Sequence, residues 1–193
     1  LQFTAALLAL WDTGRVAVLP ADDRPETLQA IAAELDGQLP ATPPSSVQAI
    51  SAPPVALAAQ QIALVLYTSG STGQPVRLSK RFDQLDSELA VHAALWPLAD
   101  CAVVAQVSHQ HIYGLLAGVL HPLCAGVPFS GRDALYPEVL AARLAEARTA
   151  GLAAVVVSSP APLSRLPTHI DWLAAGSPRR IFSSGAPLQS EHA

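Results

Sequence analysis

The chain has 193 residues, 51% hydrophobic and 13% charged, with a formal net charge of −4 at pH 7. This balance excludes a disordered chain, because 193 residues of this composition can bury a substantial core, and we expect one main folding unit. A pI of about 5.8 provides no broad attraction for nucleic acid, which is therefore not an expected partner.

Helix and strand patterns alternate along the chain. Helices are expected at residues 4–11, 25–35, 82–96, 136–150 and, weakly, 170–174, with partial helix over 111–124. Strands are expected at residues 16–19, 62–67, 101–105, 127–129, 153–157 and 180–183. Residues 36–54, rich in proline and glycine, are expected to form a surface connection. The alternation predicts an α/β fold with a mostly parallel sheet flanked by helices.

Local chemistry adds three expectations. Asp22 and Asp23 precede Pro25 and are expected to cap a helix rather than to act as an acid–base pair. Cys101 and Cys124 lack C-x-x-C spacing and are expected to be buried free thiols in a reducing, cytoplasmic setting. Residues 112–129 carry no formal charge, but a His-Pro pair and three glycines interrupt them, so no transmembrane segment is expected.

The most informative segment is residues 64–75, where an apolar run breaks into glycine and hydroxyl residues. Glycine permits tight turns, and N–H and O–H donors can then converge on one anion, as a polyphosphate requires. A Ser/Thr/Gly-rich surface loop without a ligand is the alternative that composition leaves open. The candidate phosphate-binding residues are Thr68, Ser69, Gly70, Ser71, Thr72 and Gly73.

Spacing excludes two other loop chemistries. The P-loop pattern G-x-x-x-x-G-K-[ST] fails, because Pro75 stands five residues after Gly70 and no lysine follows Gly73 directly. The nucleophile elbow G-x-S-x-G fails at both Ser69 and Ser71. A serine nucleophile is therefore not expected in this loop.

Residues 67–75, Tyr-Thr-Ser-Gly-Ser-Thr-Gly-Gln-Pro, resemble the phosphate loop of the acyl-adenylate-forming superfamily, which includes acyl-CoA synthetases, aryl-CoA ligases, peptide-synthetase adenylation domains and luciferases. Two weaker similarities follow in the family's order. His111, Tyr113 and Gly114 resemble the segment beside the family's acyl pocket. Residues 183–188 resemble the loop against which adenine and acyl group lie, and this similarity selects Ser184, Gly185, Ala186 and Pro187.

The chain departs from the family directly after the loop proline. The family usually has lysine there, whereas this chain has Val76, then Arg77, with Lys80 three residues further on. Arg77 or Lys80 is a candidate for the missing cation, although the two side chains differ in geometry and hydration. His109 and His111 could share a metal in an extended segment, but no third ligand stands nearby, and no metal site is expected in the chain.

Later family segments are not found in these 193 residues: the Tyr-Gly-x-Thr-Glu run whose glutamate helps hold magnesium, the ribose-binding aspartate, and the small C-terminal lid domain with its lysine. The chain also begins with Leu1 and contains no methionine. We therefore expect residues 1–193 to be a piece of the large N-terminal domain of a longer protein. A magnesium ligand is expected downstream.

The resemblance implies ATP-dependent activation of a fatty or aryl carboxylic acid as acyl-adenylate, then transfer to a thiol of CoA or of a phosphopantetheinyl carrier protein. ATP and Mg²⁺ are the implied cofactors, and residues 1–193 alone are expected to be inactive. Ligands of parallel sheets bind beyond the carboxyl ends of strands, so the loops at 68, 108–113 and 183–187 are expected to converge. Two alternatives stay open: a nucleotide-binding or scaffolding domain with little turnover, and a plain packing module.

Overall fold

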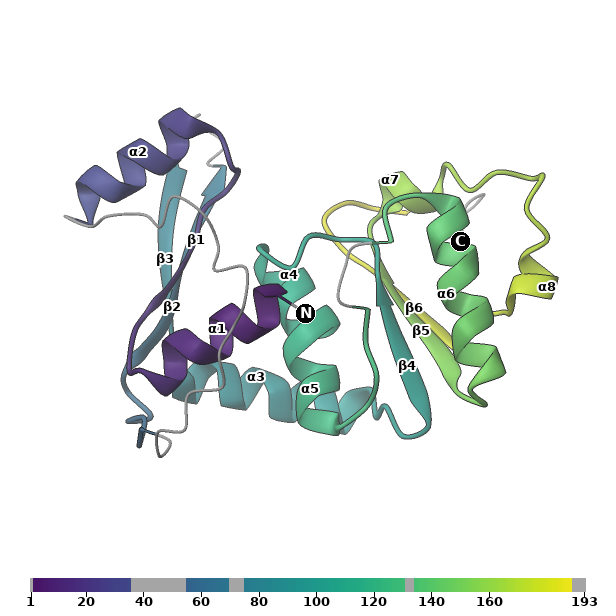
Figure 1. The fold of residues 1–193 in the computed structure, drawn as a ribbon, viewed down its shortest axis with the longest axis horizontal. Coiled ribbons are helices and arrows are strands. Elements are labelled where there is room, and N and C mark those ends of the chain that lie inside the picture. Colours follow the sequence, from purple (N-terminus) through teal and green to yellow (C-terminus); the bar gives the residue numbers. More distant parts are fainter. Residues whose placement is uncertain (1, 36–54, 70–74, 131–133, 189–193) are drawn as a thin grey trace. The chain divides into compact units, whose positions relative to one another are not determined.

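A computed structural model describes residues 2–35, 55–69, 75–130 and 134–188 (Figure 1). Its contacts divide the chain into two compact units, Leu1–Ser87 and Glu88–Ala193, instead of the single folding unit that composition led us to expect. The helix α3, Phe82–Leu95, runs across the boundary in sequence. Each unit contains its own three-stranded sheet.

The first unit is built on a mixed sheet in the order β1-β2-β3. The strands β1 and β2 are parallel, and β2 and β3 are antiparallel. β3 was not predicted, because its charged residues interrupt the apolar pattern; edge strands tolerate such charges, since one side of the strand stays unpaired. The unit comprises α1 (Gln2–Asp12), β1 (Ala17–Leu19), α2 (Pro25–Glu34), β2 (Ile62–Ser69) and β3 (Pro75–Arg81).

The core of this unit surrounds β2, whose residues 63–67 are all at most 4% exposed. Val65 and Tyr67 pack against Ile31 of α2. The Trp11 indole N–H of α1 donates a 2.8 Å hydrogen bond to the Ala63 carbonyl oxygen, so α1 is held to the same strand by a buried polar contact.

The expected cap of α2 is corrected by the structure. Arg24 occupies the N-cap position, and no side chain caps the helix. Asp22 instead accepts a hydrogen bond from the Arg24 main-chain N–H at 3.1 Å and pairs with the Arg24 guanidinium at 2.6 Å. Hydrogen bonds from Arg24 and Thr27 lower the pKa of Asp22 to about 2, so this carboxylate stabilises the turn that leads into α2.

The second unit is built on a parallel sheet in the order β4-β5-β6. The strand predictions at residues 101–105, 153–157 and 180–183 are confirmed, whereas residues 127–129 contribute only an isolated bridge between Val103 and Phe129. The unit comprises β4 (Cys101–Ala105), α4 (Ile112–Leu115), the π-helical segment η1 (Leu116–Leu120), α5 (His121–Ala125), α6 (Pro137–Thr149), β5 (Ala153–Ser158), α7 (Pro160–Leu163), α8 (Trp172–Ala175) and β6 (Arg180–Ser183).

Helices cover both faces of this parallel sheet (Figure 1). Val104 and Val156 belong to a buried cluster with Leu140 and Leu144 of α6. The alternate residues Val103, Ala105, Val155 and Val157 belong to a second cluster with Ala117 of η1. Because both sets are buried, β4 and β5 read as continuous apolar runs, as strands of a parallel sheet do.

Two further expectations are resolved in this unit. Cys101 is buried, but Cys124 is exposed at the end of α5, which corrects the expectation that both thiols are buried. Residues 112–125 form three short helical segments in succession. Within the described residues, no helix combines the length and apolarity needed to cross a bilayer.

Candidate functional site

Loops of the second unit gather at the carboxyl edge of its parallel sheet. β4, β5 and β6 are neighbours and run in the same direction, so the segments after Ala105, Ser158 and Ser183 all leave at one edge. The sequence predicted this position for residues 108–113 and 183–187. The phosphate loop follows β2 of the other unit: Thr68 and Ser69 end that strand, and residues 70–74 lie outside the described residues.

A cleft of about 560 Å³ opens at this edge. This volume lies within the range of roughly 300–1,000 Å³ that is usual for small-molecule sites. The predicted residues Ser184, Gly185, Ala186 and Pro187, together with Leu188, form one wall, and the other wall consists of Ser159, Pro160, Ala161 and Ser164. The structure therefore brings the predicted adenine and acyl loop against a second segment, at the start of α7.

Gly185 shapes the first wall through its backbone. Its φ of +97° lies in the region that residues with a Cβ rarely adopt, and a Cβ built there meets nothing within 4 Å. The requirement for glycine is therefore conformational rather than steric. Ser184, Ala186 and Pro187 are exposed along the same turn, so the wall is accessible to a ligand.

The second wall of the cleft was missed by sequence reasoning. The predicted strand at residues 153–157 carries no functional expectation for the residues that follow it. In the structure β5 ends at Ser158 and α7 begins at Pro160. The signal that could have found this wall is positional. Ser159 follows a central parallel strand directly, and such positions face ligands at the carboxyl edge of the sheet.

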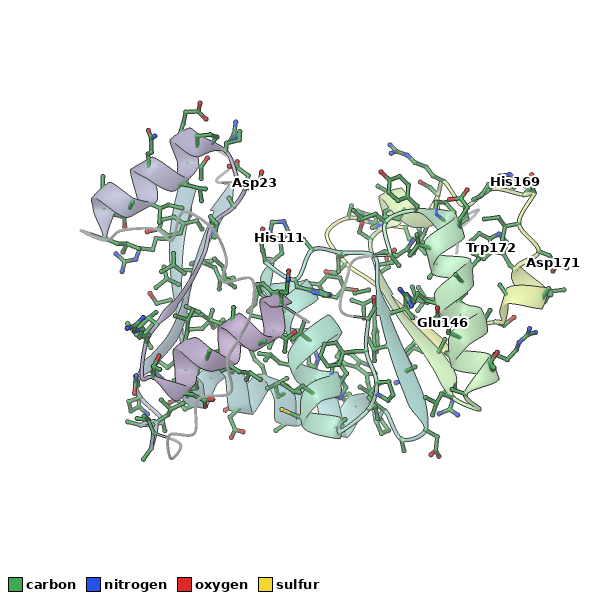
Figure 2. All side chains as sticks on the ribbon, viewed as in Figure 1. Asp23, His111, Glu146, His169, Asp171 and Trp172 are labelled. Atoms are coloured by element: carbon green, nitrogen blue, oxygen red, sulfur yellow. The ribbon has the colours of Figure 1, made fainter. Side chains whose placement is uncertain are left out.

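The candidate acyl residues have different environments. His111 is exposed and projects from the start of α4 (Figure 2). The Tyr113 hydroxyl is buried near the Ser158 backbone without a hydrogen bond of standard geometry among the described residues, and burial raises its pKa to about 12. Neither side chain is part of the cleft lining, so their contact with a substrate stays a prediction.

Gly114 has a clear packing role. A Cβ at this position would stand 2.2 Å from the Ser108 carbonyl oxygen and 2.9 Å from its carbonyl carbon. The first turn of α4 therefore contacts the loop after β4 directly, backbone against backbone. Glycine is the residue that allows this approach, and the approach sets where His111 leaves the loop.

The two neighbouring histidines do not share an environment. His109 is 7% exposed and packs beneath Gly118 of η1, where its Cδ2 lies 3.6 Å from a Cβ built on that glycine. His111 is exposed. Within the described residues, no group of three or more His, Cys, Asp or Glu side chains is arranged to hold a metal ion.

The two cation candidates lie on opposite faces of β3. Arg77 is paired with Tyr67 and Lys80 with Leu64 in the β2–β3 register, and residues three apart along a strand point to opposite sides. The Arg77 guanidinium also forms a 3.2 Å ion pair with Glu34 of α2. Arg77 and Lys80 are therefore alternatives that one ligand on one face cannot engage together.

Comparison with known proteins found no matching family model and no matching curated protein. Solved structures do match. A malonyl-CoA ligase in complex with methylmalonyl-CoA and AMP superposes with a TM-score of 0.76 at 23% identity, covering 100% of this chain and 46% of that one. A fatty acyl-adenylate ligase from L. pneumophila, in complex with acyl adenylate and pyrophosphate, gives a TM-score of 0.77 at 18% identity, covering 100% of this chain and 39% of that one.

The N-terminal domain of FACL13 from Mycobacterium tuberculosis gives a TM-score of 0.64 at 17% identity, covering 97% of this chain and 49% of that one. The chain thus spans less than half the length of each of these three structures. It has the fold of the N-terminal domain of adenylate-forming ligases, which confirms at the level of the fold the resemblance found in the sequence.

Proposed function

We propose that the protein containing this chain activates a carboxylic acid with ATP, forming an acyl-adenylate and pyrophosphate, and passes the acyl group to a thiol of CoA or of a phosphopantetheinyl carrier protein. The observation that carries the proposal is the cleft at the carboxyl edge of the parallel sheet. One of its walls is the segment whose sequence resembles the family's adenine and acyl loop, in a chain with the family's fold.

The proposed roles follow from position. Residues 184–187 and the facing residues Ser159, Pro160, Ala161 and Ser164 would flank the adenine and the acyl group. A cleft lined by serine hydroxyls together with alanine, proline and leucine side chains suits such a ligand. Thr68, Ser69, Gly70, Ser71, Thr72 and Gly73 would bind the ATP phosphates through N–H and O–H donors. Their contribution is to hold the phosphates in position and to stabilise charge, so no covalent enzyme nucleophile is required.

A bound magnesium ion would neutralise phosphate charge. Its ligand is proposed to lie in sequence beyond residue 193, as the family resemblance implies. His111 and Tyr113 would shape the acyl pocket. Because the chain spans less than half the length of the ligases that it resembles, residues 1–193 alone are proposed to turn over little acid.

A nucleotide-binding domain with little turnover is the second candidate, and one observation favours it. Val76 occupies the position of the usual lysine, and the neighbouring Arg77 is already paired with Glu34. If neither Arg77 nor Lys80 reaches the phosphates, nucleotide would bind without efficient pyrophosphate departure.

The test is carboxylate-dependent exchange of labelled pyrophosphate into ATP by the full-length protein. Exchange supports the ligase, and nucleotide binding without exchange supports the second candidate. The A186W variant fills the cleft and should lower exchange by about tenfold or more. The A142W variant adds the same bulk at an exposed site on α6 and should leave exchange unchanged. Equal exchange in A186W and the wild type would contradict the proposed role of the cleft.

A further inference from the structure

A buried polar bridge involves Ser158, the residue that directly precedes the cleft-lining residue Ser159. Gln106, the first residue after β4, is 2% exposed, and Ser158, the last residue of β5, is 0% exposed. The Ser158 hydroxyl donates to Gln106 Oε1 at 2.8 Å, and Gln106 Nε2 donates to the Ala134 carbonyl oxygen at 3.2 Å. The Gln106 main-chain N–H also donates to the Val157 carbonyl oxygen at 2.7 Å.

This bridge adds side-chain hydrogen bonds between three segments that also meet through the backbone, where the Ala134 N–H donates to the Ala105 carbonyl oxygen at 2.6 Å. The last β4–β5 pair is Ala105 and Val157, and the Gln106 and Ser158 side chains continue the connection between these two strands one residue further. Ala134 belongs to the segment that leads into α6. One amide group therefore fixes the exits of two neighbouring strands and the approach to a helix.

The polar bridge is not needed to fill the core. A buried amide and hydroxyl lose their hydrogen bonds to water, and hydrogen bonds within the protein recover only part of that free energy. An apolar pair of the same shape can be equally stable. What the hydrogen bonds of the bridge add is a fixed orientation of the two side chains. Each bond restricts the rotamer of Gln106 and of Ser158, and so restricts the backbone that carries them.

Both groups next to the bridge belong to the proposed site. Ser159, which follows Ser158 directly, lines the cleft. The buried hydroxyl of Tyr113 lies near the Ser158 backbone. A shift of the β5 exit would therefore move one wall of the cleft and the surroundings of Tyr113 together.

We propose that Gln106 is a positioning residue: through Ser158 it holds the β5 exit in the place where Ser159 and Tyr113 meet the substrate. This role rests on the proposed adenylation function. Gln106 itself would not touch the substrate, since it is buried and is not part of the cleft lining.

The test measures KM for the acid and kcat in pyrophosphate exchange by the full-length protein. The Q106L variant removes both side-chain hydrogen bonds and should raise KM by about tenfold while changing kcat less. S158A should have a similar effect, and the double variant should be no worse than Q106L, because both residues act through one bridge. The control is V156A, which opens a cavity on the α6 face of β5 and should lower stability but leave KM within about twofold.

A pH profile separates positioning from stability. Protonated glutamate has the shape and hydrogen-bonding pattern of glutamine, whereas an ionised carboxylate would oppose the Ala134 carbonyl oxygen. The ratio of the KM of Q106E to the KM of the wild type should therefore fall as the pH is lowered from about 8 to about 6, since burial raises the pKa of the new carboxyl. A pH-independent ratio of the two KM values would contradict the proposal.

Hydrogen exchange provides a measurement that needs no activity. In Q106L the amide hydrogens of Ser159, Ala161, Leu163 and Ser164 should exchange faster than in the wild type, beyond the change seen in V156A. If the wild type catalyses no pyrophosphate exchange, the adenylation function fails. If KM and the exchange of residues 159–164 are both unchanged in Q106L, the positioning role fails, whatever the activity of the wild type.

Discussion

Replacing Gly114 by alanine should destabilise the second unit, although alanine is the better helix former. The new Cβ would stand 2.2 Å from the Ser108 carbonyl oxygen, and ordinary contact begins at 3.4 Å, so the first turn of α4 and the loop must separate by about 1.2 Å. That carbonyl also accepts the main-chain N–H of His111 at 3.3 Å, and the movement disturbs this bond.

Overpacking of this kind costs about 1–3 kcal/mol, and the gain in helix propensity returns about 1 kcal/mol. We expect a net loss of up to about 2 kcal/mol, which corresponds to a fall in Tm of roughly 4–8 °C for a chain of this size. Urea and thermal unfolding of the 193-residue chain measure this loss.

The matched control is G118A, four residues further on in the adjoining π-helical segment η1. Its Cβ would approach the Ala105 Cβ to 3.2 Å, so a shift of only about 0.2 Å restores ordinary contact, and the His109 ring at 3.6 Å is already at an ordinary contact distance. Both variants share the gain in helix propensity, so their difference isolates the backbone clash at position 114. The reasoning is refuted if G114A is as stable as G118A or more stable than the wild type.

Two other predictions concern titration and thiol access. Burial lowers the pKa of His92 and of His121 below the ordinary 6.5, so the native state binds fewer protons than the unfolded state. The urea midpoint of unfolding should therefore fall as the pH drops below about 6.5, and it should fall less in H92Q. An unchanged slope in H92Q would count against this explanation. A thiol reagent should label the native protein at Cys124 and reach Cys101 only when the protein unfolds. The C124S variant should therefore show no labelling in the native state, and rapid labelling of native C124S would contradict the burial of Cys101.

The sequence predicted the parallel sheet of the second unit because its strands are short apolar runs bounded by turn residues. β3 escaped prediction because Arg77, Lys80 and Arg81 interrupt its apolar residues, and Val76 and Leu78 are exposed on this edge strand, where burial does not impose a pattern. The division into two units was also missed, since it depends on which apolar residues contact one another and not on their spacing.

The candidate site was predicted in part. Residues 184–187 were found by resemblance, and the structure places them on a cleft. Ser159 and the Gln106–Ser158 bridge were missed, because a single polar residue at a strand end has no sequence pattern of its own; its partner at position 106 lies 52 residues away. The phosphate loop at residues 70–74 stays a prediction.

The most direct test of the proposed nucleotide site is a crystal structure of the full-length protein with AMP at saturating concentration. We expect the adenine to lie in the cleft between residues 159–164 and residues 184–188. AMP bound elsewhere, or an empty cleft while AMP binding is demonstrated in solution, would contradict the assignment of this cleft.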